Sequence, residues 1–554
     1  MWDPVARELL AVERNNGEGD GDGRRIVDDE VIKPEGGKIM AGLSIDPETR
    51  DRVKLAGSMI VGTATKTTPG VADLQIAFRV DEALGNCPKY INKKRITPRV
   101  PTPRLVSEGT GVPLPQAAIE LLGKADVFFV ASKYGLKSMD VNIRGGPPGL
   151  VRVLRNREES AGGTALVYPE YSGNRLYQTL GNVHNDPAIG IVVPDFETGD
   201  VLYLTGKAAI LIGEAAAAVM PHVKLAIRID VAEARFVREG LSFRGEVIDY
   251  SPYNPPVRRL ACEKGLAADS SSDPLATARL VTRDRITPTI SRYVFKLSAS
   301  GGRKRLKAWQ PGHHVTLDFS EELDMGYSHM RDEDPQSLND DFVRTFTISR
   351  PIESEVVDED GCIKENAEPE FEITVRRHGP ATALLERWNV RVPLEVPVMG
   401  FGGAEGFKLP VRNSERGVER TSIFVAAGVG ITPIMAQGVG ALKATGNGNE
   451  LKLLWSMKGE DMPLAVDVLK RIPGLGRATK LFVTGGIGET ERCLVSTIRE
   501  LGAEFIERRI GNGDILGEGE KGKRKYYLCA GPEMTKALLK WTEGEEVAYE
   551  SFEY

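Results

Sequence analysis

The hydrophobic pattern of the first half of the chain is typical of a β-rich protein. Between residues 117 and 250, short apolar runs alternate with turns that contain glycine or proline, as in a series of consecutive strands. A helical pattern at 117–124 and a fully apolar strand at 127–131 come first. Further strands are predicted at 151–154, 165–168, 189–193, 201–204 and 208–212. The pattern therefore predicts a mostly β unit over residues 117–260.

The second half of the chain divides into two units of different character. Residues 261–276 are rich in Ala, Ser and Asp, which predicts a linker. Residues 277–409 are again β-rich. From residue 421 onward, helical segments separate apolar strands at 422–427, 451–456, 480–483 and 526–529. Strands that alternate with helices indicate a parallel α/β sheet, which we predict over 421–554.

The N-terminal region has a weaker pattern. Residues 1–37 contain few apolar side chains and much Gly, Asp and Glu, which predicts a disordered tail. Residues 38–100 are predicted to be a partial barrel segment, and a proline-rich connector from Pro98 to Pro115 follows it. The chain does not start with basic residues followed by an apolar core, so we predict no signal peptide.

Composition limits the classes of function. The 554 residues are 41% hydrophobic and 27% charged with a net charge of -6, so we expect a soluble protein without a nucleic-acid surface. The longest apolar stretch, 423–442, contains glycines and Pro433, which favours a buried strand, turn and helix over a membrane span. The five cysteines form no Cys-x-x-Cys pair. We therefore predict no metal site and a reducing, cytoplasmic location.

A glycine-rich turn is the first candidate site. Residues 428–433 read Gly-Val-Gly-Ile-Thr-Pro and directly follow the apolar strand. Gly428 and Gly430 would let the backbone approach a pyrophosphate, Thr432 can bond to it, and Pro433 suits the first turn of a helix. The spacing differs from Gly-x-Gly-x-x-Gly. A dinucleotide-binding loop is predicted, and NADH and NADPH both remain open, because Lys458 lies beside Glu460 and Asp461.

Several further motifs stand in a fixed order around this loop. In chain order they are Pro-Gly-His-His-Val at 311–315, Arg-Thr-Phe-Thr-Ile-Ser at 344–349, the strand and turn at 371–382, Met-Gly-Phe-Gly-Gly at 399–403 and Cys-Ala-Gly-Pro-Glu-Met at 529–534. Together they resemble the ferredoxin reductase superfamily over residues 277–554. The resemblance implies a Greek-key flavin-binding β-barrel followed by a parallel α/β nucleotide-binding domain.

The same resemblance implies roles for individual residues. Arg344 would neutralise flavin phosphate, Phe346 would pack on the isoalloxazine, and Thr347 would donate a hydrogen bond near flavin N5. Thr347 and Cys529, which the resemblance places near the nicotinamide, are the predicted catalytic residues. The other predicted cofactor-binding residues of this half are Thr345, Ser349, Gly379, Ala381, Thr382, Gly531 and Phe552.

Residues 38–250 resemble the pyridoxamine 5′-phosphate oxidase-like family, whose fold is an FMN-binding split β-barrel. Arg152 and Val153 fit the strand that supports FMN, and the turn from Ser172 to Arg175 fits the phosphate grip with one basic residue instead of two. The barrel could bind FMN, bind another cofactor, or serve only as structure. The resemblance also implies a homodimer through the barrel. The first barrel segment is short, so either it has decayed or the start of the chain is incomplete.

These observations predict an enzyme, an NAD(P)H-dependent flavin oxidoreductase. Electrons would pass from NADH or NADPH through FAD to a second acceptor, which could be FMN in the N-terminal barrel, a small molecule or a partner protein. Hydride transfer needs no general acid or base, and no such pair stands out in the sequence. The alternative is a flavin- or ligand-binding redox sensor with little turnover.

Overall fold

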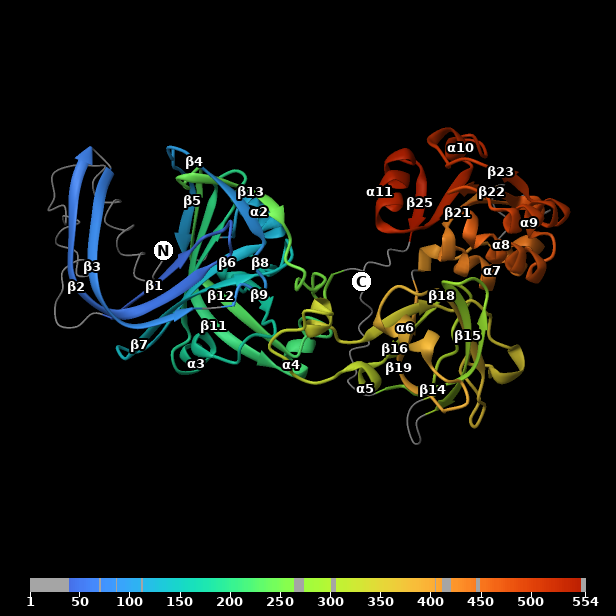
Figure 1. Ribbon diagram of the computed structural model, residues 1–554, viewed down its shortest axis with the longest axis horizontal. Coiled ribbons are helices and arrows are strands. Elements are labelled where there is room, and N and C mark those ends of the chain that lie inside the picture. The colour runs from blue at the N-terminus through green and yellow to red at the C-terminus, as the bar shows by residue number, and fades with distance from the viewer. Residues whose placement is uncertain are drawn as a thin grey trace. The chain divides into compact units, whose positions relative to one another are not determined.

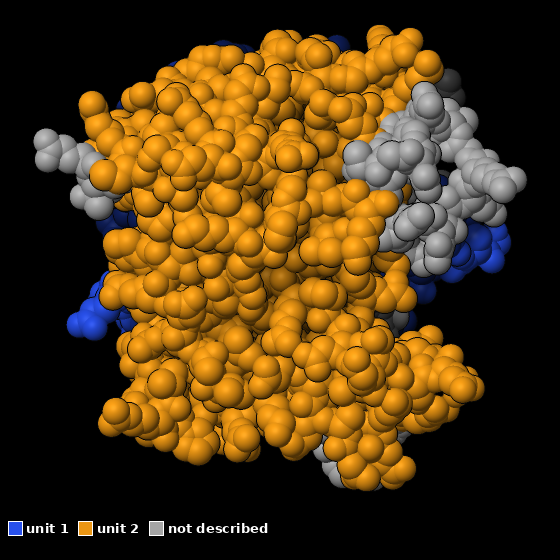
Figure 2. Space-filling view, turned by 90° about the vertical axis from the view of Figure 1, so that its right-hand side faces the viewer, with its two compact units in different colours: residues 1–270, 326–340 blue, residues 271–325, 341–554 orange. Residues whose placement is uncertain are grey.

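The computed structural model describes residues 39–68, 71–85, 87–110, 113–263, 274–299, 305–403, 405–410, 420–444 and 449–549. Packing divides the chain into two compact units, coloured separately in Figure 2. Unit 1 comprises residues 1–270 and 326–340, and unit 2 comprises 271–325 and 341–554. Residues 326–340, which the sequence places inside the barrel of 277–409, thus group with unit 1. The predicted tail of 1–37 lies outside the described residues.

Unit 1 is built on an eight-stranded antiparallel sheet (Figure 1). Its strands are β5 (Arg104–Thr110), β6 (Val127–Tyr134), β7 (Ser138–Gly145), β8 (Arg152–Asn156), β9 (Thr164–Pro169), β10 (Ala188–Pro194), β11 (Val201–Ile212) and β12 (Leu225–Arg238). Three helices accompany them, α2 (Gln116–Lys124), α3 (Gln178–Asn185) and α4 (Glu214–Ala217). The sheet order is β7-β6-β10-β11-β12-β9-β8, and β5 also pairs with β12.

Strand β11 joins two strands that the sequence separates. The polar residues between 204 and 208 suggest a turn, but the strand continues through them with a register shift at Thr205 and Gly206. A Cβ atom on Gly206 would lie 2.2 Å from the carbonyl oxygen of Asp230. Glycine here therefore allows a bulge and a close approach of β12 rather than a chain reversal.

Unit 1 also contains two smaller sheets. Strands β1 (Ile39–Ile45), β2 (Arg52–Thr68) and β3 (Val71–Gly85) form one antiparallel sheet, and β4 (Lys93–Pro98) pairs with β13 (Phe243–Asp249). Figure 1 shows β2 and β3 as a long two-stranded ribbon that extends from the larger sheet. The sequence predicts only a partial barrel segment here, because the glycines and threonines of β2 obscure the alternation of polar and apolar positions.

Unit 2 begins with a six-stranded antiparallel sheet, ordered β17-β16-β19-β14-β15-β18. The strands are β14 (Ala276–Arg285), β15 (Ile290–Ala299), β16 (His314–Asp318), β17 (Val343–Thr347), β18 (Glu370–Arg376) and β19 (Glu395–Gly402). A β-bridge from Ile348 to Ile373 joins the two ends of this order, so the sheet curls back on itself. Helices α5 (Ser320–Leu323) and α6 (Pro380–Arg387) accompany it.

The rest of unit 2 is a six-stranded parallel sheet, ordered β23-β22-β21-β20-β24-β25. Its strands are β20 (Arg420–Ala427), β21 (Asn449–Lys458), β22 (Thr479–Thr484), β23 (Glu504–Ile506), β24 (Arg524–Cys529) and β25 (Glu546–Tyr549). The helices are α7 (Thr432–Ala444), α8 (Met462–Arg471), α9 (Glu489–Glu500), α10 (Asn512–Leu516) and α11 (Pro532–Trp541). The prediction of a mostly β protein with an α/β part is confirmed.

Alternating residues of β20 explain why helices cover both faces of this sheet. Phe424 and Ala426 belong to a core cluster with residues of α7, α8 and α9. Ile423 and Val425 face a second cluster that includes residues of α10 and α11. A strand buried on both faces must be apolar throughout, as β20 is from 423 to 427. Within the described residues, no helix has the length and apolar character that a membrane span requires.

Candidate functional site

The glycine loop lies where the strand order of the parallel sheet changes direction. Strand β20 is flanked by β21, which follows it in the chain, and by β24, which comes four strands later. In the register of these parallel strands, Ala426 on β20 is level with Cys529 on β24. Loops at the carboxyl ends of such strands form the usual ligand crevice of an open parallel sheet. The structure therefore brings Gly428, Thr432, Pro433, Cys529 and Gly531 to one edge.

Two glycines of the loop serve different purposes. Gly428 has a φ of +52°, which favours glycine, and its carbonyl accepts a hydrogen bond of 2.9 Å from the Trp455 indole. A Cβ atom on Gly430 would lie 2.1 Å from the carbonyl oxygen of Cys529. The sequence attributes Gly430 to pyrophosphate binding. The structure adds a second reason, because only glycine lets this loop approach the end of β24.

Two helix N-termini meet the same edge of the sheet. Helix α7 begins at Thr432, which is buried, and Pro433 stands in its first turn. Helix α11 has Gly531 as its N-cap and a proline in its first turn. Helix N-termini present unpaired backbone N–H groups and a partial positive charge. The edge thus has the donors that a pyrophosphate requires.

An arginine of the antiparallel sheet, whose role the sequence alone does not reveal, reaches the glycine loop. Arg376, at the end of β18, places one guanidinium nitrogen 2.5 Å from a carboxylate oxygen of Asp461 and another 2.8 Å from the Thr289 hydroxyl. The same guanidinium is 3.6 Å from a Cβ position on Gly428. Asp461 is buried, and its second carboxylate oxygen has no hydrogen-bond partner within the described residues. A sequence signal was present, since Arg376 lies within the strand and turn at 371–382.

Strand β17 carries the predicted flavin residues on both of its faces. Arg344 pairs across the sheet with Leu317 and Phe346 with Val315, whereas Thr347 pairs with His314. Side chains alternate along a strand, so Arg344 and Phe346 share one face, and Thr345 and Thr347 share the other.

The immediate contacts of these side chains are with protein. The Phe346 ring is 7% exposed and meets Phe319 edge-on, with ring centroids 6.2 Å apart. Arg344 lies 3.6 Å from a carboxylate oxygen of Asp341, and the hydroxyls of Thr345 and Thr316 are 3.4 Å apart. The predicted flavin contacts of this strand remain predictions.

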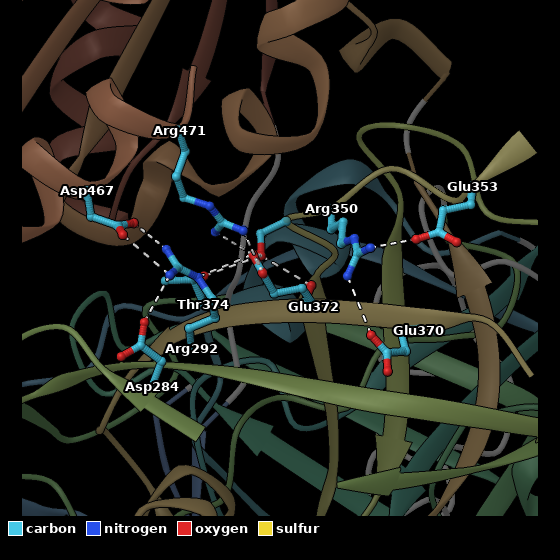
Figure 3. Close-up of polar contacts among 10 residues, drawn as sticks. Asp284, Arg292, Arg350, Glu353, Glu370, Glu372, Thr374, Asp467 and Arg471 are labelled. Carbon is cyan, nitrogen blue, oxygen red and sulfur yellow. Dashed lines mark hydrogen bonds and ion pairs between the residues drawn. The ribbon is translucent and has the colours of Figure 1, made fainter. Parts of the chain in front are cut away.

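Ser349 bonds to Glu372, which belongs to a polar network whose charged members Figure 3 labels. Its hydroxyl donates to a carboxylate oxygen of Glu372 at 2.9 Å. Arg471 of helix α8 binds both oxygens of Glu372, each at 2.9 Å. Arg292 of β15 lies 3.4 Å from Glu372 and also pairs with Asp467 of α8 (Figure 3). The network therefore fastens the antiparallel sheet to helix α8 of the parallel sheet.

The ionisation states of Glu372 and Arg471 are set by the groups to which they bond. Burial by itself would raise the pKa of Glu372, but hydrogen bonds and charge from Arg471, with further help from Arg292 and Ser349, lower it below its usual value. The pKa of Arg471 is raised, chiefly by its hydrogen bonds to Glu372. Both groups are therefore ionised at neutral pH, and Ser349 is held by a carboxylate.

The turn before helix α6 has an exposed N-terminus. Gly379 is the N-cap and is solvent-exposed, and Ala381 is buried beneath it. The Thr382 hydroxyl oxygen accepts hydrogen bonds from the amides of His378 at 2.9 Å and Gly379 at 3.1 Å. This internal cap shapes the turn that the sequence assigns to flavin phosphate. Phe552, the last predicted cofactor residue, lies outside the described residues.

In unit 1 the predicted FMN residues contact protein groups. Arg152 forms an ion pair with Glu263, and Val153 beside it is half-buried. The Ser172 amide donates to the Asn339 side chain at 2.9 Å. The Arg175 guanidinium lies 3.5 Å from the centre of the Tyr327 ring. Asn339 and Tyr327 belong to segment 326–340, which therefore engages the turn predicted to hold FMN phosphate.

Comparisons with known proteins give structural likenesses of limited extent. No family model matches the chain, and no curated protein matches it. Similar solved structures include full-length CYP116B46 from Tepidiphilus thermophilus, with 20% identity over 50% of this chain and 28% of that chain, and a TM-score of 0.31. A flavohemoglobin from Malassezia yamatoensis with bound FAD and heme has 15% identity over 50% and 60%, with a TM-score of 0.32.

A third similar structure is a shorter protein. It is the flavohem-like FAD/NAD-binding domain of nitric oxide dioxygenase from Vibrio cholerae O1 biovar El Tor. Its identity is 16%, over 50% of this chain and 99% of that chain, with a TM-score of 0.33. The chain covers less than two thirds of the first two proteins and nearly all of the third.

Proposed function

We propose that unit 2 is an NAD(P)H-dependent flavin reductase module of the ferredoxin reductase type. The observation that carries this proposal is the edge of the parallel sheet at Gly428 and Cys529. A glycine loop, two helix N-termini and the change of strand order coincide there. These are the features that favour a dinucleotide pyrophosphate over other ligands.

The residues present fit both cofactors. A nicotinamide dinucleotide would be held by the backbone of Gly428 and Gly430 and by Thr432 at the start of α7. The phosphates of FAD would be held by Arg344 and by amides of the exposed turn before α6, from Gly379 to Thr382. A guanidinium and a helix N-terminus supply the charge and donors that phosphates need. Bound FAD would supply the chemistry, accepting hydride from the nicotinamide and releasing electrons.

The chain's own residues would orient these groups. Thr347 is buried at the end of β17 and can donate a hydroxyl proton toward a flavin ring edge. Cys529 is buried at the end of β24, and its carbonyl fixes how closely the loop at Gly430 approaches. Arg376, paired with Asp461, places a positive charge beside Gly428. We infer that Arg376 positions the loop and favours an anionic ligand there.

We propose that unit 1 either holds the second electron acceptor, as bound FMN, or provides the surface on which a separate acceptor binds. FMN at Arg152 and Ser172–Arg175 would have to replace contacts that Glu263, Asn339 and Tyr327 now make. A small molecule or a separate electron-accepting protein needs no such replacement. We further propose a cytoplasmic protein and a homodimer formed through unit 1, for which sedimentation is the test.

Two measurements test the function. Purified full-length protein is denatured, and the released cofactors are separated by chromatography, with FAD expected. Oxidation of NADH and NADPH is then followed with a dye acceptor. Steady turnover supports the reductase. FAD binding without turnover would favour the alternative, a flavin- or ligand-binding redox sensor, and release of no flavin at all would contradict the reductase.

A further inference from the structure

A partly buried polar cluster lies in unit 1, and its member Glu170 lies two residues before Ser172 of the predicted FMN turn. It joins strand β2 to strand β7 and to the end of β9. Its cationic members are Arg52, Lys54 and Arg144, and its carboxylates are Asp140 and Glu170. Polar residues alternate with apolar ones on β2 and β7, so these side chains share the face between the two strands. The cluster has one more cation than carboxylates.

Two of the cations have complete sets of partners. Lys54 pairs with Asp140 and also donates to the Gln178 side chain at 2.7 Å. Asp140 accepts a further hydrogen bond of 2.8 Å from the Thr179 hydroxyl. Arg144 binds both oxygens of Glu170, at 3.0 and 3.2 Å. Each carboxylate of the cluster therefore already has its cation.

Arg52 is the cation without a counter-charge. Within the described residues, one of its terminal nitrogens donates to the carbonyl of Cys87, and the guanidinium makes no ion pair. Its Nε atom is buried and has no hydrogen-bond partner among those residues. Burial, and then the like charge of Arg144, lower the pKa of Arg52 to about 10. Arg52 as a whole is half-buried, and a charge that is partly removed from water without a counter-charge is destabilising.

Two buried phenol groups lie near this cluster. The Tyr171 hydroxyl makes no hydrogen bond within the described residues, whereas the Tyr168 hydroxyl lies within hydrogen-bonding reach of Arg144. Tyr168 lies close enough to Arg144 and Glu170 for both charges to affect its pKa, and Tyr171 directly follows Glu170. Burial raises the pKa of both phenols, so both hydroxyls keep their protons. They are therefore donors in an environment that already has an excess of positive charge.

We propose that Arg52 binds an oxyanion, most simply the phosphate group of a ligand, with Arg144 beside it. An anion would supply the missing negative charge and accept the unused Nε–H of Arg52. The planar guanidinium fork matches the geometry of phosphate oxygens. The site differs from the predicted FMN turn at Ser172–Arg175, and it does not depend on the reductase activity of unit 2.

The test measures phosphate binding to the full-length protein by titration calorimetry, with excess FAD present to occupy unit 2. The wild-type protein, Arg52→Gln, Arg52→Lys and Arg79→Gln are compared. Arg79 is a matched control because it is exposed on β3 of the same sheet and paired with Asp81. Wild type and Arg79→Gln should bind inorganic phosphate equally. Arg52→Gln should bind it roughly tenfold or more weakly, and Arg52→Lys should fall between.

A second measurement separates a ligand site from a merely structural arginine. In phosphate-free buffer, Arg52→Gln should unfold at the same temperature as wild type or higher, because the variant removes an unpaired, half-buried charge. FMN forms a second arm of the titration. If wild type binds FMN more tightly than inorganic phosphate, and Arg52→Gln binds the two with equal affinity, the oxyanion is the phosphate of a flavin. Equal binding of both assigns a free phosphate.

Three results would overturn the proposal. One is phosphate and FMN binding that is unchanged in Arg52→Gln. Another is a wild-type protein that binds neither compound. The third is a large drop in the unfolding temperature of both Arg52 variants without phosphate, since that result would make Arg52 part of the fold.

Discussion

The two units carry two predicted phosphate grips, and their surroundings differ. In unit 2, the turn before α6 is exposed at Gly379, and Arg344 has the carboxylate of Asp341 at 3.6 Å. In unit 1, Arg152 pairs with Glu263, and the turn from Ser172 to Arg175 is engaged by Asn339 and Tyr327. A short motif identifies which groups can bind phosphate. Distant segments of the chain determine what those groups bind in the fold.

The buried charges of the two units show a related difference. In unit 2, Arg292 and Arg471 are matched by Glu372, Asp467 and Asp284, as Figure 3 shows. In unit 1, Arg52 has only a neutral carbonyl as partner within the described residues. A network with every charge paired is expected to fasten parts of a protein together. An unpaired, half-buried cation is instead a reason to look for a ligand.

The largest expected effect comes from the glycine loop of unit 2. Gly430→Val should reduce NAD(P)H oxidation to near background, because its Cβ would lie 2.1 Å from the Cys529 carbonyl oxygen. Dye-coupled NADH and NADPH kinetics measure this, together with the FAD content. Gly513→Ala is the control, since a Cβ there meets nothing within 4 Å. Unchanged kinetics in Gly430→Val would remove the dinucleotide loop from the site.

The paired network of unit 2 should give the next largest effect. Glu372→Ala leaves Arg471 and Arg292 without their shared carboxylate, and removing one partner of a buried ion pair costs about 3–5 kcal/mol. Denaturant unfolding followed by fluorescence measures the change. Glu353→Ala, which removes an exposed partner of Arg350, should cost less than about 1 kcal/mol. Equal effects of the two variants would show that the network contributes no more than a surface pair.

The phosphate grip of unit 2 is tested by Arg344→Ala. Loss of a charge-assisted contact should weaken FAD binding by roughly 1.5–3 kcal/mol, or about tenfold to a hundredfold. Fluorescence titration of FAD into the flavin-free protein measures this. Arg387→Ala, at the exposed end of α6, is the control. Full FAD affinity in Arg344→Ala would exclude Arg344 from the grip.

The stability of the fold is expected to depend on pH through His314, which lies on β16 next to β17. Burial, and then the charge of His313, lower the pKa of His314 to about 4, against 6.5 in the unfolded chain. The unfolded state therefore binds the proton first, and stability falls as pH drops from 6.5 toward 4. Between pH 7.5 and 5.5 the expected loss is about 1 kcal/mol.

Thermal unfolding at the two pH values measures this loss. His314→Asn should reduce the pH dependence, whereas His378→Gln, at an exposed position, should retain it. A pH dependence that is the same in wild type and His314→Asn would assign the effect to another group.

The smallest expected effect tests whether the turn from Ser172 to Arg175 in unit 1 can bind the phosphate of FMN. Tyr327→Ala releases Arg175 from a ring 3.5 Å away, a contact worth about 0.5–1 kcal/mol when partly exposed. FMN affinity should rise by a few-fold at most, as measured by fluorescence titration. Tyr134→Ala, which removes a comparable contact with Lys137, should leave it unchanged. If FMN affinity falls instead, Tyr327 is part of the FMN site.

Much of the fold follows from local pattern. Predicted strands 422–427, 451–456, 480–483 and 526–529 fall within β20, β21, β22 and β24, and all of these strands pair in parallel. The glycine loop stands between a strand and a helix as predicted. These features depend on the period of apolar residues and on turn chemistry, which a few neighbouring residues determine.

Other features depend on partners that lie far away in the sequence, and only the tertiary structure decided them. Residues 326–340 group with unit 1 although their neighbours on both sides belong to unit 2. Arg376 meets Asp461, and Ser349 meets Glu372, across 85 and 23 residues. The sequence by itself determined which side chains can donate, accept or carry charge. Folding decided which of them neutralise one another, because pairing depends on distance in space rather than along the chain.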